Sequence, residues 1–257
     1  MKKAIFITLV AVGAASSFGQ DFNVNATQIW SGAAGTKANT GFGVADDASY
    51  SNVTNFSGSA FSNGGATTTI TNLVADDLLT VSPNQVIEGI TFSVSNLDTV
   101  AFTARARVRF YADSGTGVPG NLLGGLSFNP ISFNPGTVGL FTYDVGTALF
   151  SVPADGKVWA GITFDNVGAT ATTANLNNLG QGIFNPPTSG SSTDLAFRTT
   201  ANGSFFASAP AGATFNFGGT PVANFGWAFT AVPEPASFAV IGLGLLGLAA
   251  RRRRSSK

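Results

Sequence analysis

The chain has 257 residues with 13 basic and 13 acidic side chains, and it contains neither cysteine nor histidine. The lack of histidine excludes Ser-His-Asp triads and imidazole metal sites, and the lack of cysteine excludes disulfides and thiol nucleophiles. We therefore expect a protein that is held together by its hydrophobic core and is not an enzyme.

Residues 1–19 have the layout of a secretory signal peptide. Met1-Lys2-Lys3 is basic, residues 4–15 are apolar, and the small residues Ser17 and Gly19 follow. This order of a basic, an apolar and a small-residue region is typical of a cleaved export signal. We expect cleavage after Gly19; the alternative is an N-terminal helix that is retained.

The two ends of the chain conceal the charge of the part between them. They hold seven of the 13 basic residues, namely Lys2, Lys3, Lys257 and the four arginines 251–254, but only one acidic residue, Glu234. Residues 20–231 therefore carry six basic and twelve acidic side chains. Such an acidic surface favours solubility and argues against nucleic-acid binding.

Residues 20–231 are predicted to form one all-β domain. They are rich in Gly, Ser, Thr, Asn and Phe, a composition that disfavours helices and favours short strands joined by turns. Their length is ample for a single antiparallel β-sandwich, which we expect to be jelly-roll-like. Strands are predicted at residues 28–30, 51–56, 67–74, 86–94, 99–112, 122–126, 139–144, 157–164, 194–199, 214–217 and 222–230, and a loop at 175–187.

The clearest strand pattern lies at Thr99–Ala112. Apolar residues from Phe102 to Phe110 alternate with Arg105, Arg107 and Arg109, so the three arginines share the opposite face. One interpretation is a stripe that binds an anionic ligand such as an acidic exopolysaccharide. The other, which we favour, is a solvated face on which the arginines pair with aspartates of neighbouring strands.

A turn rich in glycine follows this strand at residues 113–120. Asp113 at its start is a candidate Ca²⁺ ligand, because that ion takes oxygen ligands from turns. Asp46-Asp47 and Asp76-Asp77 are further candidates. The turn does not match an EF-hand loop, and aspartate in turns commonly bonds the nearby backbone instead, so we expect no obligatory cofactor.

Three tryptophans bear on sugar binding. Trp30, Trp159 and Trp227 would serve as platforms for sugar rings if they formed an exposed row. Trp159 and Trp227 lie within strand patterns, where packing in the core is the expected role. The exposure of these rings therefore separates a carbohydrate-binding module from a scaffold.

The C-terminal segment, residues 232–257, combines three elements. Val232, Pro233, Glu234 and Pro235 form a box, residues 236–250 are almost wholly apolar, and Arg251, Arg252, Arg253 and Arg254 end the run. As a helix, the apolar run would span roughly 22 Å, somewhat less than the ~30 Å hydrocarbon core of a bilayer. The arginine cluster marks the side that stays cytoplasmic.

These three elements in this order resemble the PEP-CTERM sorting signal. The resemblance implies an exported protein of a Gram-negative bacterium that is handled by an exosortase-type membrane enzyme, with Pro233, Glu234 and Pro235 as the recognition box. It further implies a membrane-tethered intermediate and then a place at the cell surface or in the extracellular matrix. The alternative is an ordinary single-span C-terminal anchor.

Three functions remain open for residues 20–231. The first is a structural or adhesive role in the envelope or in an exopolysaccharide matrix, which the resemblance implies. The second is an extracellular carbohydrate-binding module. The third is a hydrolase, which would need two or more carboxylates that converge in a cleft.

Overall fold

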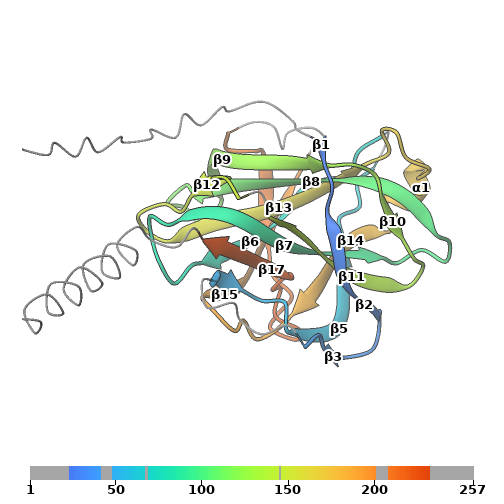
Figure 1. The fold of residues 1–257 in the computed structure, drawn as a ribbon, viewed down its shortest axis with the longest axis horizontal. Helices are drawn as coiled ribbons and strands as arrows, with labels where there is room; N and C mark the ends of the chain where they lie inside the picture. Colours follow the sequence, from blue (N-terminus) through green and yellow to red (C-terminus); the bar gives the residue numbers. More distant parts are fainter. Residues whose placement is uncertain (1–22, 42–47, 67–68, 145, 201–207, 232–257) are drawn as a thin grey trace, which may run out of the picture.

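The computed structural model describes residues 23–41, 48–66, 69–144, 146–200 and 208–231. These residues form two β-sheets that pack face to face, with β8 and β9 along one side and β7 and β11 along the other (Figure 1). The first sheet has the order β1 (Asn23–Val24), β9 (Pro119–Phe128), β8 (Phe102–Asp113), β13 (Lys157–Asp165), β6 (Val74–Leu79), β15 (Ser191–Thr199) and β16 (Gly212–Phe215), with β10 (Ile131–Phe133) paired to β8.

The second sheet is built around its longest strand, β7. Almost all strand pairs in both sheets are antiparallel, the exception being the short parallel pair of β1 and β9. The second sheet has the order β2 (Thr27–Ala33), β11 (Thr137–Asp144), β7 (Val86–Asn96), β14 (Leu179–Phe184), β5 (Asn55–Ser62) and β3 (Ala38–Asn39); β12 (Phe150–Ser151) and β17 (Trp227–Ala231) also pair with β7, and β4 (Ala48–Ser51) pairs with β17. The predicted all-β sandwich is confirmed.

The main core lies between the two sheets. The apolar face predicted for β8 is confirmed, since every residue from Phe102 to Phe110 on that face is at most 6% exposed. Phe110 meets the second sheet edge-on, with ring centroids 6.0 Å from Trp227 and 5.6 Å from Phe229. Aromatic pairs of this geometry contribute about 0.5–1.5 kcal/mol beyond their burial. Aromatic packing thus stabilises a chain without disulfides.

Several elements differ from the sequence prediction. In the described part of the strand expected at residues 67–74, which starts at residue 69, a strand begins only at Val74, as β6, and before it Ile70 makes an isolated bridge to Asp165. β14 (Leu179–Phe184) lies inside the predicted loop. Its two glycines hide the strand pattern, and a Cβ on Gly180 would stand only 1.8 Å from the carbonyl oxygen of Phe61. Close approach of β5 therefore requires glycine there.

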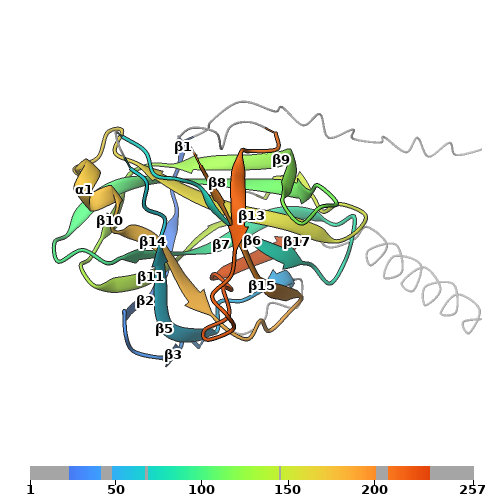
Figure 2. The same cartoon turned by 180° about the vertical axis from the view of Figure 1, so that it is seen from behind.

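The described residues contain one short helix, α1 (Thr173–Leu176). Thr172 caps it, accepting from the backbone N–H of Asn175. Asp98, in the turn between β7 and β8, accepts hydrogen bonds from Asn175 Nδ2 at 2.9 Å and Asn178 Nδ2 at 3.1 Å. These bonds fix the end of the sandwich at which α1 lies (Figure 2).

Candidate functional site

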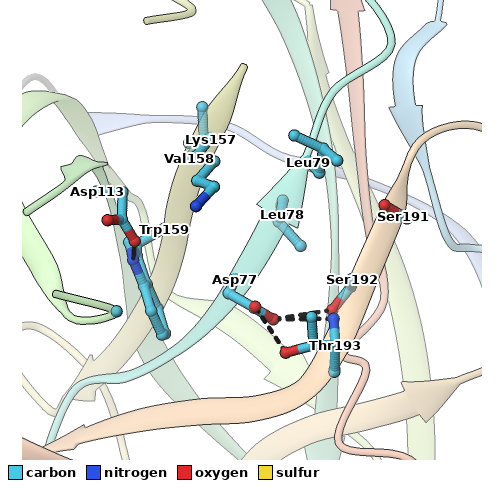
Figure 3. A pocket seen from close by; sticks show the side chains of 11 residues that line it. Asp77, Leu78, Leu79, Asp113, Lys157, Val158, Trp159, Ser191, Ser192 and Thr193 are labelled. Atoms are coloured by element: carbon cyan, nitrogen blue, oxygen red, sulfur yellow. Dashed lines mark hydrogen bonds between the residues drawn. The ribbon is translucent and has the colours of Figure 1, made fainter. Parts of the chain in front are cut away.

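A hollow of about 180 Å³ lies on the outer face of the first sheet. It sits where the start of β13, the end of β8, the end of β6 and the start of β15 come together. Figure 3 shows Asp113 and Trp159 on one side and Asp77, Ser192 and Thr193 on the other. These residues, with Lys157 and the exposed Leu79, give a mainly apolar floor with charged and hydroxyl groups around it.

Strand pairing explains why Asp77 and Trp159 share this hollow. They are direct cross-strand partners on β6 and β13, so their side chains leave the same face of the sheet. Asp77 Oδ2 accepts from Thr193 Oγ1 at 2.7 Å, and its Oδ1 accepts from the Thr193 backbone N–H at 3.1 Å. Burial raises the pKa of Asp77 above its ordinary value, and the bonds from Thr193 offset part of that rise.

Asp113 is positioned by the turn that it begins. Its Oδ1 accepts from the backbone N–H of Gly115 at 2.6 Å, and Ser114 N–H donates to Val118 O at 3.0 Å to close the turn. Gly115 has φ +82°, a conformation that glycine adopts without strain. Asp113 lies two residues after Tyr111, the cross-strand partner of Trp159. Because alternate residues of a strand share a face, Asp113 lies on the same face of the sheet as Trp159.

Trp159 forms part of the floor. Its Nε1–H donates to Asp113 Oδ2 at 3.0 Å, and its ring packs edge-on against Phe197 with centroids 6.3 Å apart. The residue is 1% exposed and belongs to a second, smaller hydrophobic cluster with Leu73 and Tyr111 on this outer face. Trp159 therefore closes the hollow from below and is not a flat exposed platform.

Lys157 supplies the positive charge at this site. It is exposed at the first position of β13, directly across from Leu79 of β6. Among the described residues, no ion pair or hydrogen bond involves its ammonium group. The hollow therefore combines two carboxyl groups with one ammonium group whose donors are available.

Asp76 points to the opposite side of β6 from Asp77, into the space between the sheets. It is fully buried; its Oδ2 accepts from the backbone N–H of Phe225 at 2.7 Å, and its Oδ1 lies 3.0 Å from Ser192 Oγ. Burial, and next the charge of Asp77, raise the pKa of Asp76 well above its ordinary value. Burial and the charge of Asp76 likewise raise the pKa of Tyr50. Asp76 therefore belongs to the interior between the sheets, whereas Asp77 lines the hollow on the outer face.

Two of the three arginines that were predicted to share one face of β8 pair with the same carboxylate. Arg105 Nε lies 2.9 Å from Asp165 Oδ1, and Arg107 forms an ion pair with the same side chain. Asp165 stands directly across from Arg105 on β13 and is 1% exposed, while both arginine side chains are 12% exposed. The structure thus has the pairing across neighbouring strands that the sequence analysis favours for this face.

Arg109 is 3% exposed, so the prediction of a solvated face is wrong at this position. Its cross-strand neighbours are Gly125 on β9 and Gly161 on β13, which leave room for the side chain to lie flat on the sheet. Its Nη1 donates to Val108 O at 2.7 Å and to Leu126 O at 3.1 Å. The three arginines therefore do not form an exposed stripe.

Of the candidate calcium ligands, only Asp77 and Asp113 line the same hollow. Asp76 and Asp77 face opposite sides, and Asp113 is engaged by its own turn and by Trp159. Within the described ranges, no group of three or more acidic side chains is arranged to hold a metal ion. Asp46 and Asp47 lie outside the described residues.

The other two tryptophans also pack against neighbouring side chains. Trp227 is fully buried in the main core. Trp30 is half-buried on the far face of the second sheet, with its ring 5.7 Å from that of Phe56 and 6.2 Å from that of Phe184. The tryptophans thus form no aligned exposed row.

The predicted signal peptide and the segment from Val232 to Lys257 lie outside the described residues, and β17 ends at Ala231 just before that segment. In the part of the chain that the structure describes, no helix is long and apolar enough to cross a membrane.

No curated protein and no solved structure gives a significant match to the chain. Residues 231–254 match the PEP-CTERM protein-sorting motif, as the resemblance predicts. The chain therefore carries a PEP-CTERM signal, which an exosortase recognises and which marks a protein exported and sorted to the cell surface or extracellular space.

Proposed function

We propose that this protein is a structural or adhesive component of the envelope or exopolysaccharide matrix of a Gram-negative bacterium. It reaches that place through a membrane-tethered intermediate, held by residues 236–250 until an exosortase-type enzyme processes it. The observation that carries the proposal is the sorting motif at residues 231–254. The motif follows directly on β17, so the folded domain is the part delivered to the surface.

The packing of the domain supports a scaffold in preference to a platform-type carbohydrate-binding module. Trp159 and Trp227 are at most 1% exposed, and Trp30 packs against Phe56 and Phe184. Sugar platforms need an aromatic face open to solvent. These three tryptophans pack instead within the hydrophobic clusters of the two sheets.

A carboxylate-based hydrolase is the second candidate, because Asp77 and Asp113 line one hollow. Glycosidases use one carboxyl group as an acid and another as base or nucleophile. The scaffold is favoured because both oxygens of Asp113 already accept hydrogen bonds from the protein, one from Gly115 and one from Trp159. Such bonds hold a carboxylate in a structural role.

The test is the intact mass of the protein in each cell fraction of its native host. We expect surface or extracellular material that lacks the first ~19 residues, as after signal peptide cleavage, and the region beyond the Pro-Glu-Pro box. Glu234→Gln should leave unprocessed protein in the inner membrane. Glu88→Gln, which changes the only other glutamate, is the matched control and should be processed normally. Wild-type protein that keeps residues 236–257 in the inner membrane would refute sorting.

A further inference from the structure

We propose that Arg198, on β15, forms with Asn72 and Gly64 a binding site for a carboxylate group. Arg198 shares the inner face of the first sheet with Val74, its direct cross-strand partner on β6 and a member of the main core. Its side chain reaches the turn that follows β5 of the second sheet, where a Cβ on Gly64 would stand only 2.6 Å from Arg198 Nη2. The site therefore lies beside the space between the two sheets, apart from the hollow on the outer face.

Arg198 is the arginine without a charged or hydrogen-bonding partner in the described part of the chain. The other three described arginines are engaged, since Arg105 and Arg107 pair with Asp165 and Arg109 donates to two backbone carbonyls. A half-buried guanidinium ion without a counter-charge has lost part of its hydration and gained no compensating bond. This position therefore favours the binding of an anion.

The accessible end of the guanidinium presents two donor groups side by side. Nε of Arg198 is enclosed by the protein and has no hydrogen-bond partner among the described residues. The terminal nitrogens Nη1 and Nη2 also lack a partner there, but they are not enclosed in this way. Parallel N–H groups of a guanidinium match the two oxygens of a carboxylate, a geometry that an ammonium group lacks. A carboxylate therefore fits both the charge and the shape of this end.

The amide of Asn72 lies close to this guanidinium. Asn72 is two residues before Val74, the partner of Arg198, and so occupies the diagonal position, about 7–8 Å away and within reach of a long side chain. A Cβ on Gly65 would stand only 2.2 Å from Asn72 Nδ2, so the two side chains lie against the consecutive glycines 64 and 65. The amide NH₂ group makes no hydrogen bond among the described residues and supplies a further donor.

The turn under these two side chains is held in place by the protein itself. Gly64 N–H donates to Ser62 Oγ at 3.1 Å, and Gly64 O accepts from the Asn72 backbone N–H at 3.1 Å. Gly64 and Gly65 have φ +56° and +69°, a conformation that glycine adopts without strain. The surface on which the donor side chains rest is therefore fixed, which lowers the conformational entropy that binding costs.

The acidic residue on the same face of β6, Asp76, does not neutralise Arg198. Asp76 lies two residues after Val74, but its oxygens are engaged by the backbone N–H of Phe225 and by Ser192 Oγ. Burial raises the pKa of Asp76 well above its ordinary value, which favours the neutral carboxyl group. The positive charge of Arg198 therefore remains available to a ligand.

A single positive charge selects a group with a single negative charge. A carboxylate neutralises Arg198 fully, whereas a phosphate dianion would keep a negative charge in half-buried surroundings. Residues 20–231 carry six basic and twelve acidic side chains, so the protein as a whole also repels multiply charged anions. Carboxylate groups of the required kind occur on free organic acids and on the uronic acid residues of acidic polysaccharides.

The experiment uses the secreted protein without its signal peptide. The probes are acetate, methyl β-glucuronide, an oligoglucuronate, inorganic phosphate and, as a neutral control, methyl β-glucopyranoside. NMR follows the signals of each probe and the side-chain Nε–H of Arg198, which has no hydrogen-bond partner among the described residues. We expect the carboxylates to bind and to shift that resonance, and phosphate and the neutral glycoside to bind at least about tenfold more weakly.

The carboxylate probes also distinguish the two sources of this group. Tighter binding per carboxylate of the oligoglucuronate than of acetate would support the site and assign it to uronic acid polymers. Equal binding per carboxylate would support the site and assign it to free organic acids. Failure of every carboxylate to bind, or tighter binding of phosphate, would overturn the proposal.

Variants of Arg198 locate the site. Arg198→Gln should weaken the binding of methyl β-glucuronide at least about tenfold, the loss expected for hydrogen bonds to a charged group. Arg198→Lys keeps the charge without the two parallel donors and should also bind more weakly than the wild type. Lys37→Gln removes an exposed positive charge elsewhere and should bind like the wild type. Unchanged binding by Arg198→Gln would refute the site.

A matched pair at Ala213 tests the site without removing any of its residues. Ala213 is exposed on β16, directly across from Arg198. Ala213→Glu supplies a carboxylate from the chain itself, so it should occupy Arg198 and prevent glucuronide binding while resistance to urea stays equal or rises. Ala213→Gln has the same size without the charge and should bind like the wild type. Equal binding by both variants would contradict the proposal even if Arg198→Gln failed to fold.

Carboxylate binding at this site does not depend on the sorting pathway. Arg198→Gln should be processed and located like the wild type, because the motif at residues 231–254 is intact. Loss of carboxylate binding together with normal location would support both proposals. A wild-type protein that binds carboxylates but keeps residues 236–257 in the inner membrane would refute sorting and support the site.

Discussion

Asp76→Asn is expected to flatten the pH dependence of stability. Asp76 is fully buried, and burial together with the charge of Asp77 raises its pKa well above 3.8. The folded state therefore holds the Asp76 proton more tightly than the unfolded chain. The stabilisation that Asp76 contributes is fully present below its pKa in the unfolded chain, and it is lost as pH rises toward its pKa in the folded protein. The slope in that window approaches about 1.4 kcal/mol per pH unit.

Asparagine keeps the shape and the main hydrogen bonds of this site without the charge. Its amide oxygen would accept from Phe225 N–H, now 2.7 Å from Oδ2, and its NH₂ would face Ser192 Oγ. The Ser192 hydroxyl can then donate to Asn224 Oδ1, which lies 2.9 Å away. We therefore expect Asp76→Asn to be close to the wild type at low pH and more stable than it near neutrality.

The assay is urea unfolding followed by tryptophan fluorescence at intervals from about pH 4 to about pH 8, a range that begins near the ordinary pKa of an aspartate and extends above it. Asp144→Asn removes an exposed aspartate and should leave the slope almost unchanged. Asp76→Ala should be less stable at every pH, because the buried N–H of Phe225 loses its acceptor at a cost of about 1–3 kcal/mol. Parallel curves for the wild type and Asp76→Asn would refute the reasoning.

Two further predictions concern carboxylates on the first sheet. Asp165→Asn leaves Arg105 and Arg107 half-buried without their shared counter-charge. We therefore expect the free energy of unfolding, measured in urea, to fall by about 3–5 kcal/mol. A change below about 1 kcal/mol would mean that water already compensates the charges of these arginines. Asp194 accepts from the backbone N–H of Ala223 at 2.6 Å and of Gly219 at 2.7 Å, and these bonds lower its pKa against the opposing effect of burial. Asp194→Ala should therefore speed amide hydrogen exchange at residues 217–223 while the exchange of β8 stays slow, and uniform acceleration would instead indicate global destabilisation.

Local patterns in the sequence were sufficient for the fold class. The alternation along residues 102–110 identified the buried face of β8, because successive side chains of a strand point to opposite sides. The box, apolar run and arginine cluster identified the sorting motif, since these elements are contiguous in the chain. β14 was missed because its glycines, needed for close approach of β5, weaken the pattern.

The sequence by itself therefore determined the all-β class and the sorting signal, both of which depend on neighbours along the chain. Only the tertiary structure determined which charged side chains are buried and which residues they contact. Arg109 is buried because Gly125 and Gly161, distant in sequence, flank it across two strands. Asp77 joins Trp159 at a hollow because β6 pairs with β13. Sheet pairing is non-local, and its register fixes which side chains meet.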